Sequence, residues 1–113
     1  RAEALADRLS SGLDDVRRAA ATLPVRPRTF FEEWDQPLIS GIRWVEELVR
    51  VAGGDPIFPE LAGAGLAKDR IVDPADVARR DPEVVFSSWC GKRMKKATIV
   101  GRPGWQEVSA VRH

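Results

Sequence analysis

The segment from Arg28 to Val51 limits the possible folds more than any other part of the sequence, because it predicts a strand, a polar corner and a helix in that order. Its apolar start, Thr29–Phe31, is typical of a β-strand that is buried on both faces. Pro37 cannot continue a strand ladder, so we expect the strand to end in the corner Glu32–Pro37. Ligand sites of open α/β sheets lie beyond the carboxyl ends of the strands, which is where this corner falls.

A helix is predicted directly after the corner. Ser40 is its expected N-cap, and Gly53 with Gly54 is its expected end. Apolar residues recur between these limits at spacings of three and four, which places on one helix face Ile42, Val45, Leu48 and Val49. The charged residues of the segment fall mostly on the other face: Arg43, Glu46, Glu47 and Arg50.

Residues 1–23 form the longest periodic segment and predict an amphipathic helix that ends at Pro24–Pro27. Its apolar residues recur every three or four positions and form one stripe, made of Leu5, Leu9, Leu13, Val16, Ala20 and Leu23. We expect this stripe to pack into a core. The helical pattern is already under way at Arg1, and His113 follows no closing element, so we expect the chain to be part of a longer protein.

The second half of the sequence repeats the alternation of strand, loop and helix. Ile71-Val72 is either a short strand or a buried step. Asp73 followed by Pro74 predicts the start of a short helix, which Asp81-Pro82 ends. The remaining expectations are a helical turn at Pro59–Ala62, a second strand at Pro82–Ser88, a basic helix at Arg93–Val100 and the start of a further strand at Ala110–Val111.

This alternation predicts an α/β fold with a mainly parallel sheet, and 113 residues suit a single core. Right-handed crossovers bring the carboxyl ends of parallel strands to one edge of the sheet. Polar and aromatic residues of three connections are therefore expected to gather there: Glu33, Trp34, Asp35 and Gln36, then Lys68, Asp69 and Arg70, then Ser88, Trp89, Cys90 and Lys92.

Composition narrows the function classes only slightly. The 18 Lys and Arg residues nearly balance the 17 Asp and Glu residues, so the charge gives no reason to expect nucleic acid or a membrane surface as a partner. No apolar run approaches the roughly 18 residues that a transmembrane helix requires. A single cysteine, Cys90, excludes an internal disulfide.

Few residues at the predicted edge suggest catalysis. Cys90 is the only thiol, and Lys92 nearby would favour its thiolate form. The only histidine, His113, is the last residue, which argues against a Cys-His pair, and a structural or ligand-facing cysteine is the simpler interpretation. Glu32 and Glu33 are neighbours on a strand, so they point to opposite faces and cannot form an acid-base pair. The sequence contains neither a zinc-ligand spacing nor a glycine-rich phosphate loop.

The tryptophans are more informative. Trp34 and Trp89 both fall in predicted corners, where an indole offers a bulky ligand a flat apolar surface and one hydrogen-bond donor. Loop packing is the alternative for this pair, and packing in the core or on the surface is the expected role of Trp44 and Trp105. The basic run Lys92–Lys96 fits either an anion site or a solvated helix face.

Three blocks of the sequence, Arg26–Phe58, Lys68–Arg93 and Arg102–His113, resemble the C-terminal lobe of the periplasmic substrate-binding proteins that serve ABC importers of cobalamin, haem and iron-siderophores. The most similar branch is the one labelled cobalamin-binding. Proteins of this family have two α/β lobes joined by one long rigid helix, and they hold the ligand in the cleft between the lobes. The resemblance implies a three-layer α/β/α lobe at residues 24–113, with residues 1–23 as the inter-lobe helix and the N-terminal lobe absent.

The resemblance also implies where the site lies. The cleft wall of this lobe matches the predicted sheet edge, which gives as ligand-binding residues Glu33, Trp34, Asp35, Gln36, Lys68, Arg70, Trp89, Cys90 and Lys92. Cobalamin binders carry a tryptophan in the middle loop, whereas Ala67–Arg70 contains no aromatic residue. Family members dock on the permease through an acidic residue on each lobe, and Asp76 lies near that position. Completing a helix N-terminus is the alternative role of Asp76.

The resemblance implies the substrate-binding component of an ABC importer for cobalamin or for a chelate of iron or another metal, with no enzymatic activity and no cofactor or metal of its own. The expected partners are a membrane permease, the N-terminal lobe and a bulky small molecule, and nucleic acid is not expected. The expected location is the periplasm, or the outer side of the membrane through a lipid anchor. Two alternatives stay open: an enzyme of α/β fold that depends on Cys90, and a self-associating interaction domain.

Overall fold

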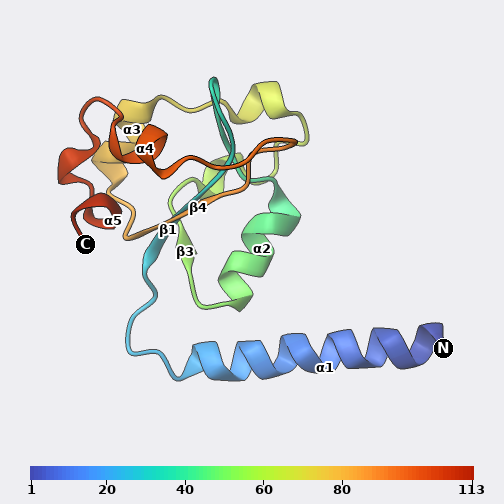
Figure 1. The fold of residues 1–113 in the computed structure, drawn as a ribbon. Helices are drawn as coiled ribbons and strands as arrows, with labels where there is room; N and C mark the ends of the chain where they lie inside the picture. The colour runs from blue at the N-terminus through green and yellow to red at the C-terminus, as the bar shows by residue number, and fades with distance from the viewer.

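Strand β1 (Arg28–Asp35) is the centre of the sheet, and every other strand pairs with it (Figure 1). The computed structural model describes all residues from 1 to 113. Strands β3 (Asp55–Pro56) and β4 (Val84–Ser87) run parallel to β1, whereas β2 (Leu38–Ser40) returns antiparallel to it. The predicted α/β fold with a mainly parallel sheet is confirmed.

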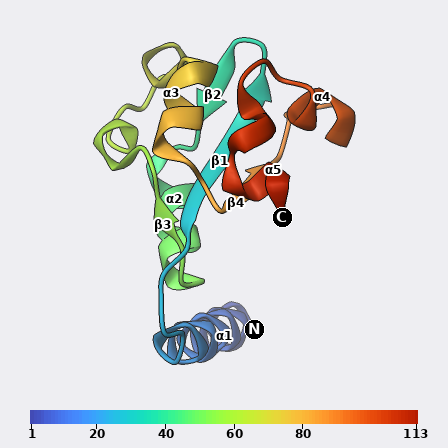
Figure 2. The same ribbon diagram turned by 90° about the vertical axis from the view of Figure 1, so that its left-hand side faces the viewer.

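Helices cover both faces of this sheet. In Figure 2, α3 and α5 lie in front of β1 and α2 lies behind it, so the protein has three layers. The helices are α1 (Ala2–Ala21), α2 (Arg43–Val51), α3 (Pro74–Arg80), α4 (Lys96–Val100) and α5 (Ser109–Arg112), and the single 3-10 turns are η1 (Pro59–Leu61), η2 (Ala67–Arg70) and η3 (Trp105–Glu107).

The core lies between β1 and the layer of α3 and α5. Successive side chains of a strand point to opposite faces, and Phe30 is the β1 residue at the centre of this layer. Its ring packs edge-on against Phe58 at 5.9 Å and against Trp105 at 6.4 Å between ring centroids. The other buried members are Leu38, Val72, Val77, Trp89, Ile99 and Val108. Trp105 is thus a core residue, as expected, whereas Trp44 lies 63% exposed on α2.

The polar corner of the sequence is a β-hairpin. Strand β1 ends at Asp35, inside the predicted corner Glu32–Pro37, and its last residues pair with β2, with Trp34 opposite Ile39. A register shift between Glu32 and Trp34 accommodates the pairing. Ser40 does not cap a helix: it is buried in β2, and α2 begins after Ile42 without a side-chain cap.

Helix α1 forms as predicted, but the core packing predicted for its apolar stripe is wrong for this structure. Only Ala20 is buried, and the residues exposed by 40% or more are Leu5, Leu9, Leu13, Val16 and Leu23. Figure 1 shows α1 along one side of the molecule, with only its C-terminal end beneath α2. Gly53 follows the end of α2, as predicted, and adopts a φ of 101°. Its backbone lies close to Ala20 and Leu23, and this is where α1 contacts the rest of the protein.

The second half confirms several predictions and corrects two. Asp73 caps α3 by accepting a hydrogen bond from the Ala75 N–H at 2.9 Å, and the turn η1 and strand β4 form at the expected places. Ile71 makes one isolated bridge with Ile39, so no strand forms here, and only Val72 of this pair is buried, since Ile71 is 48% exposed. The basic helix is shorter than predicted, since α4 begins only at Lys96.

The strand predicted at Ala110–Val111 is wrong, because these residues belong to α5. Asp81 accepts hydrogen bonds from the Ser109 N–H at 2.7 Å and the Ser109 hydroxyl at 2.8 Å. These bonds lower the pKa of Asp81. They also tie the start of α5 to Asp81, the residue that ends α3.

Candidate functional site

The carboxyl ends of β1 and β4 meet at one edge of the sheet, and Lys92 joins the side chains of both. Its ammonium lies 4.5 Å from the ring centroid of Trp34 and 5.1 Å from that of Trp89. The same ammonium lies 2.9 and 3.0 Å from the two carboxylate oxygens of Asp35, and this hydrogen bond lowers the pKa of Asp35. We call Trp34, Asp35, Trp89 and Lys92 the Lys92 cluster. A cation over an indole face is attracted by the negative face of the ring.

Both indole N–H groups of the Lys92 cluster are already used inside the protein. Trp34 Nε1 donates to the carbonyl oxygen of Gln36 at 3.0 Å, and Trp89 Nε1 donates to Glu32 Oε2 at 3.2 Å. The expectation that these indoles offer a free donor is therefore wrong, and only ring surface is left for a ligand. Trp34 is half-buried and offers more of that surface than Trp89, which is 6% exposed.

Arg70 connects the middle loop to the hairpin. Its guanidinium lies 3.0 Å from Glu33 Oε2 and donates to the carbonyl oxygens of Ser40 at 2.6 Å and Ala64 at 2.9 Å. Glu33 also accepts a hydrogen bond from the Ile42 N–H at 2.9 Å, at the start of α2. Because Arg70 is only 3% exposed, its charge is not available to solvent, and its main role is to hold the middle loop against the hairpin.

Glu46 is a buried carboxyl that the sequence pattern assigned to the polar face of its helix. It lies on the first turn of α2 and is only 4% exposed. Burial raises its pKa to about 7, Arg50 opposes the rise and the nearby Glu33 adds to it. The Ser40 hydroxyl lies close to the Glu46 carboxyl and, like Arg70, opposes the rise in its pKa.

Glu32 and Glu33 point to opposite faces of the sheet, as predicted. Glu32 is fully buried and forms a two-pronged ion pair with Arg102, with oxygen–nitrogen distances of 2.6 and 3.1 Å. Ser87 and Trp89 complete its hydrogen bonds, and the Arg102 guanidinium stacks 4.5 Å from the Trp105 ring centroid. This buried network links β1, β4 and the Arg102 segment beneath the sheet edge, and it engages both carboxylate oxygens of Glu32.

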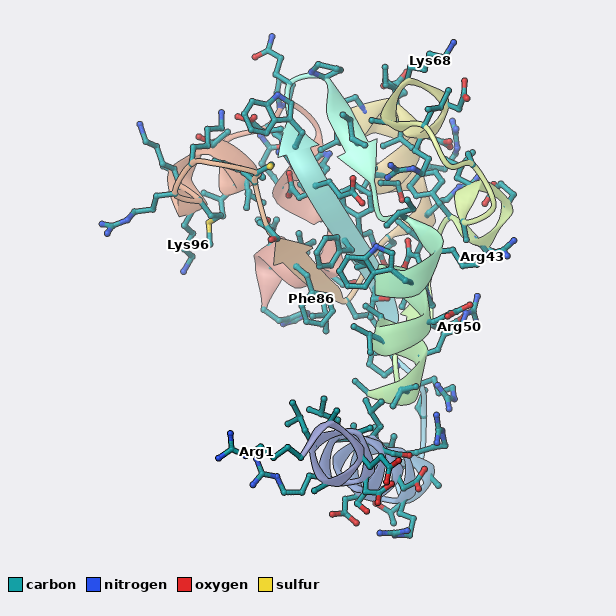
Figure 3. The ribbon with its side chains drawn as sticks, turned by 90° about the vertical axis from the view of Figure 1, so that its right-hand side faces the viewer. Arg1, Arg43, Arg50, Lys68, Phe86 and Lys96 are labelled. Atoms are coloured by element: carbon teal, nitrogen blue, oxygen red, sulfur yellow. The ribbon has the colours of Figure 1, made fainter.

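The other predicted site residues surround these groups. Gln36 lies at the tip of the hairpin, and together with Asp35 it borders an open hollow of about 450 Å³. Cys90 is exposed, and its backbone N–H donates to the Glu33 carbonyl oxygen at 3.4 Å. Lys68 is exposed on η2 and projects from the upper edge of the face in Figure 3. No three His, Cys, Asp or Glu side chains are grouped so that they could hold a metal ion.

Asp76, the predicted docking residue, lies away from these groups on α3. Its carboxylate pairs with Arg79 and lies 3.7 Å from Arg80. Asp73, not Asp76, supplies the cap of this helix. No helix of the protein combines the length and the apolar character needed to cross a bilayer.

A family model described as periplasmic binding protein matches residues 1–113. The chain belongs to the periplasmic binding protein family. This is a family of binding proteins rather than enzymes, and it normally works with the permeases of ABC transporters. Membership implies a location outside the cytoplasm. No curated protein matches the chain.

Solved structures agree with this family at the level of the fold. A possible iron-binding periplasmic solute-binding protein of Staphylococcus epidermidis superposes with a TM-score of 0.76 at 17% identity, over 98% of this chain and 43% of its own. The haem-binding protein RhuT of Roseiflexus sp. RS-1 superposes with a TM-score of 0.74 at 20% identity, over 97% of this chain and 43% of its own. The vitamin B12 binding protein BtuF of Vibrio cholerae superposes with a TM-score of 0.65 at 23% identity, over 97% of this chain and 41% of its own.

These solved periplasmic binding proteins are all more than twice as long as the part that this chain matches. The chain spans less than half of each of them.

Proposed function

We propose that this chain is one lobe of the solute-binding component of an ABC importer, and that its ligand is cobalamin or a chelate of iron or another metal. The Lys92 cluster carries the proposal, because it joins two chain corners, 57 residues apart in the case of Asp35 and Lys92, at the carboxyl edge of the sheet. Ligands of open α/β sheets bind at that edge. The three structural relatives are described as a possible iron-binding protein, a haem-binding protein and a vitamin B12 binding protein.

Helix α1 is proposed to connect this lobe, residues 24–113, to a second lobe that precedes it. The exposed stripe of α1 supports the proposal, because a contiguous apolar helix face needs a covering partner. The length of the structural relatives, more than twice that of the matched region, supports it as well. The ligand would then lie between the two lobes, and lobe closure would produce the form that the permease recognises.

The nine predicted residues are proposed to form this lobe's wall of the cleft in two roles. Trp34, Lys68, Lys92, Gln36 and Cys90 have exposed or half-buried side chains and are proposed to contact the ligand. Glu33, Asp35, Arg70 and Trp89 are paired or buried and are proposed to hold the contacting groups in place. The protein is proposed to perform no reaction. Asp76 is proposed to meet the permease, with the protein free in the periplasm or held by a lipid anchor.

Ligand titration of the full-length protein tests the proposal. Cyanocobalamin, a ferric trihydroxamate and a ferric tris-catecholate are each titrated while tryptophan fluorescence is recorded. We expect saturable quenching with at least one of them, and loss of most of that quenching in Trp34→Phe, whose ring lies at the edge. Trp44→Phe is the matched control, because Trp44 is highly exposed on α2 and takes no part in the Lys92 cluster. Absence of a saturable signal with all three compounds would contradict the proposal.

A further inference from the structure

Two carboxyl groups and one guanidinium meet where the hairpin, helix α2 and the middle loop join. Glu33 comes from the end of β1, Glu46 from the first turn of α2 and Arg70 from η2. Arg70 and Glu46 are only 3% and 4% exposed, so water has little access to either group. A buried carboxylate is costly unless a cation is paired with it. The single positive charge of Arg70 compensates only one of the two carboxylates.

Glu33 already holds this cation. Its Oε2 lies 3.0 Å from the Arg70 guanidinium, and its Oε1 accepts a hydrogen bond from the Ile42 N–H at 2.9 Å. Glu46 forms no ion pair, since every ion pair of the protein involves other residues. The buried positive charge is therefore committed to Glu33, and a negative charge on Glu46 would have no partner of its own.

The surroundings of Glu46 accordingly favour its protonated form. Burial raises its pKa to about 7, and the nearby Glu33 adds to the rise. Three groups oppose it: Arg50 on the same helix, the Ser40 hydroxyl of β2, and Arg70. Arg50 is exposed and projects from the outer side of α2 in Figure 3, so water screens its effect. Loss of the Glu46 proton near neutral pH therefore brings a second negative charge to a place with one buried cation.

Arg70 also holds the middle loop against the hairpin. Its guanidinium donates to the carbonyl oxygen of Ser40 in β2 at 2.6 Å. A second bond joins the same two segments, because the Val72 N–H donates to the Leu38 carbonyl oxygen at 2.9 Å. A segment held by local bonds of this kind can separate from its neighbour while the rest of the protein stays folded.

We propose that Glu46 makes this connection sensitive to pH: loss of its proton weakens the Glu33–Arg70 pair, and the middle loop then separates from the hairpin more often. The second carboxylate repels Glu33 and competes with it for Arg70, and separation lets water reach both carboxylates. Under the proposed function, a ligand that touches both the hairpin and the middle loop would bind less tightly above pH 7. The pH-sensitive connection itself does not depend on that function.

The change in the separated fraction can be worked out from the proton equilibrium of Glu46. Separation exposes its carboxyl to water and returns its pKa from about 7 to 4.5. The separated state is then favoured tenfold for each pH unit between these two values, and the dependence levels off above pH 7. From pH 6 to pH 8 the separated fraction should therefore rise about tenfold.

Hydrogen exchange of the full-length protein at pH 6 and pH 8, corrected for the intrinsic effect of pH on exchange, measures this fraction. Protection of the Val72 amide should fall about tenfold. Repeating the measurement in low urea distinguishes local separation from global unfolding, because urea dependence scales with the surface exposed, and exchange of Val72 at pH 8 should depend little on urea. Glu46→Gln should abolish the pH dependence at Val72. Glu47→Gln is the matched control and should keep it, because Glu47 is the exposed neighbour on the same helix.

Glu33→Gln gives a second test, because it frees Arg70 to compensate Glu46. The pH dependence at Val72 should be largely lost in this variant as well. Unchanged protection between pH 6 and pH 8, a pH effect that persists in Glu46→Gln, or a urea dependence as steep as that of global unfolding would overturn the proposal. No ligand is present in the experiment, so its result is independent of the proposed binding function.

Discussion

Replacement of Glu46 by glutamine is expected to change how the stability of the protein depends on pH. Glutamine has the shape of a protonated glutamate but cannot ionise. The pKa of Glu46 is raised from 4.5 to about 7 by its burial on α2. Between these two pH values the folded protein holds a proton that the unfolded chain has released, so the stability contributed by this group falls as pH rises from 4.5 to 7. Above that range the loss is complete and the contribution is flat.

The size of the effect follows from the shift. Each unit of pKa difference corresponds to 1.36 kcal/mol, so ionisation of Glu46 costs the fold about 3 kcal/mol across the range. Such a loss is a large fraction of the roughly 5–15 kcal/mol that holds a domain of ordinary stability together. Glu46→Gln should therefore be more stable than the unmodified protein at pH 8 by roughly 2 to 3 kcal/mol, and nearly equal to it near pH 5.

Urea unfolding at pH 5 and pH 8, followed by circular dichroism, measures the free energy of unfolding of both proteins. Glu47→Gln is the matched control, because Glu47 is the exposed neighbour on the same helix. Its replacement should change the free energy of unfolding by a small and equal amount at both pH values. Equal changes in the Glu46→Gln variant at the two pH values would refute the reasoning. A variant that loses stability specifically at pH 8 would show that the Glu46 carboxylate is stabilised in its charged form.

Two further substitutions test the supports of the edge. Arg102→Met leaves the fully buried Glu32 carboxylate without its cation. We expect the free energy of unfolding, measured by urea titration, to fall by about 3–5 kcal/mol, and a fall below about 1 kcal/mol would contradict the buried pairing. Gly53→Ala places a side chain at a φ of 101° and a Cβ 2.7 Å from Leu23, so it should destabilise the protein by more than about 1 kcal/mol. It should also loosen α1, which faster hydrogen exchange in the last turn of that helix would show. An unchanged melting temperature would refute the strain.

The sequence was sufficient for elements with strong local signals. The Asp73 cap with Pro74 at the first helical position predicted the start of α3, and the apolar run before Ser88 predicted β4. Short segments misled: Leu38–Ser40 precedes a helix and looks like its cap, yet its backbone finds partners in β1. At Ala110–Val111, residues that were predicted to begin a strand belong to α5, whose start is held by hydrogen bonds from Ser109 to Asp81, a residue distant in sequence.

The meeting of the corner residues Trp34, Asp35, Trp89 and Lys92 was predictable from the sequence, but the interactions around them were not. Strand ends marked the edge, because parallel strands carry their corners to the same side. The partners of Glu32 and Glu33 are Arg102 and Arg70, which lie far along the chain, and no spacing rule connects them. Glu46 was assigned to a solvated face because helix periodicity locates the apolar stripe without showing that Glu33 and Ser40 of the neighbouring strands lie beside its margin.

The internal use of both indole donors has a consequence for molecular discrimination. In the proposed site, a ring face would attract a flat partner without imposing a preferred rotation about the axis that joins them, so stacking on Trp34 would select for shape and area rather than for a particular pattern of substituents. Fine distinctions among related compounds would then depend on the other side chains of the cleft wall. Evolution of a new specificity on this scaffold would accordingly proceed by replacing those side chains, with the aromatic surface kept as a common platform.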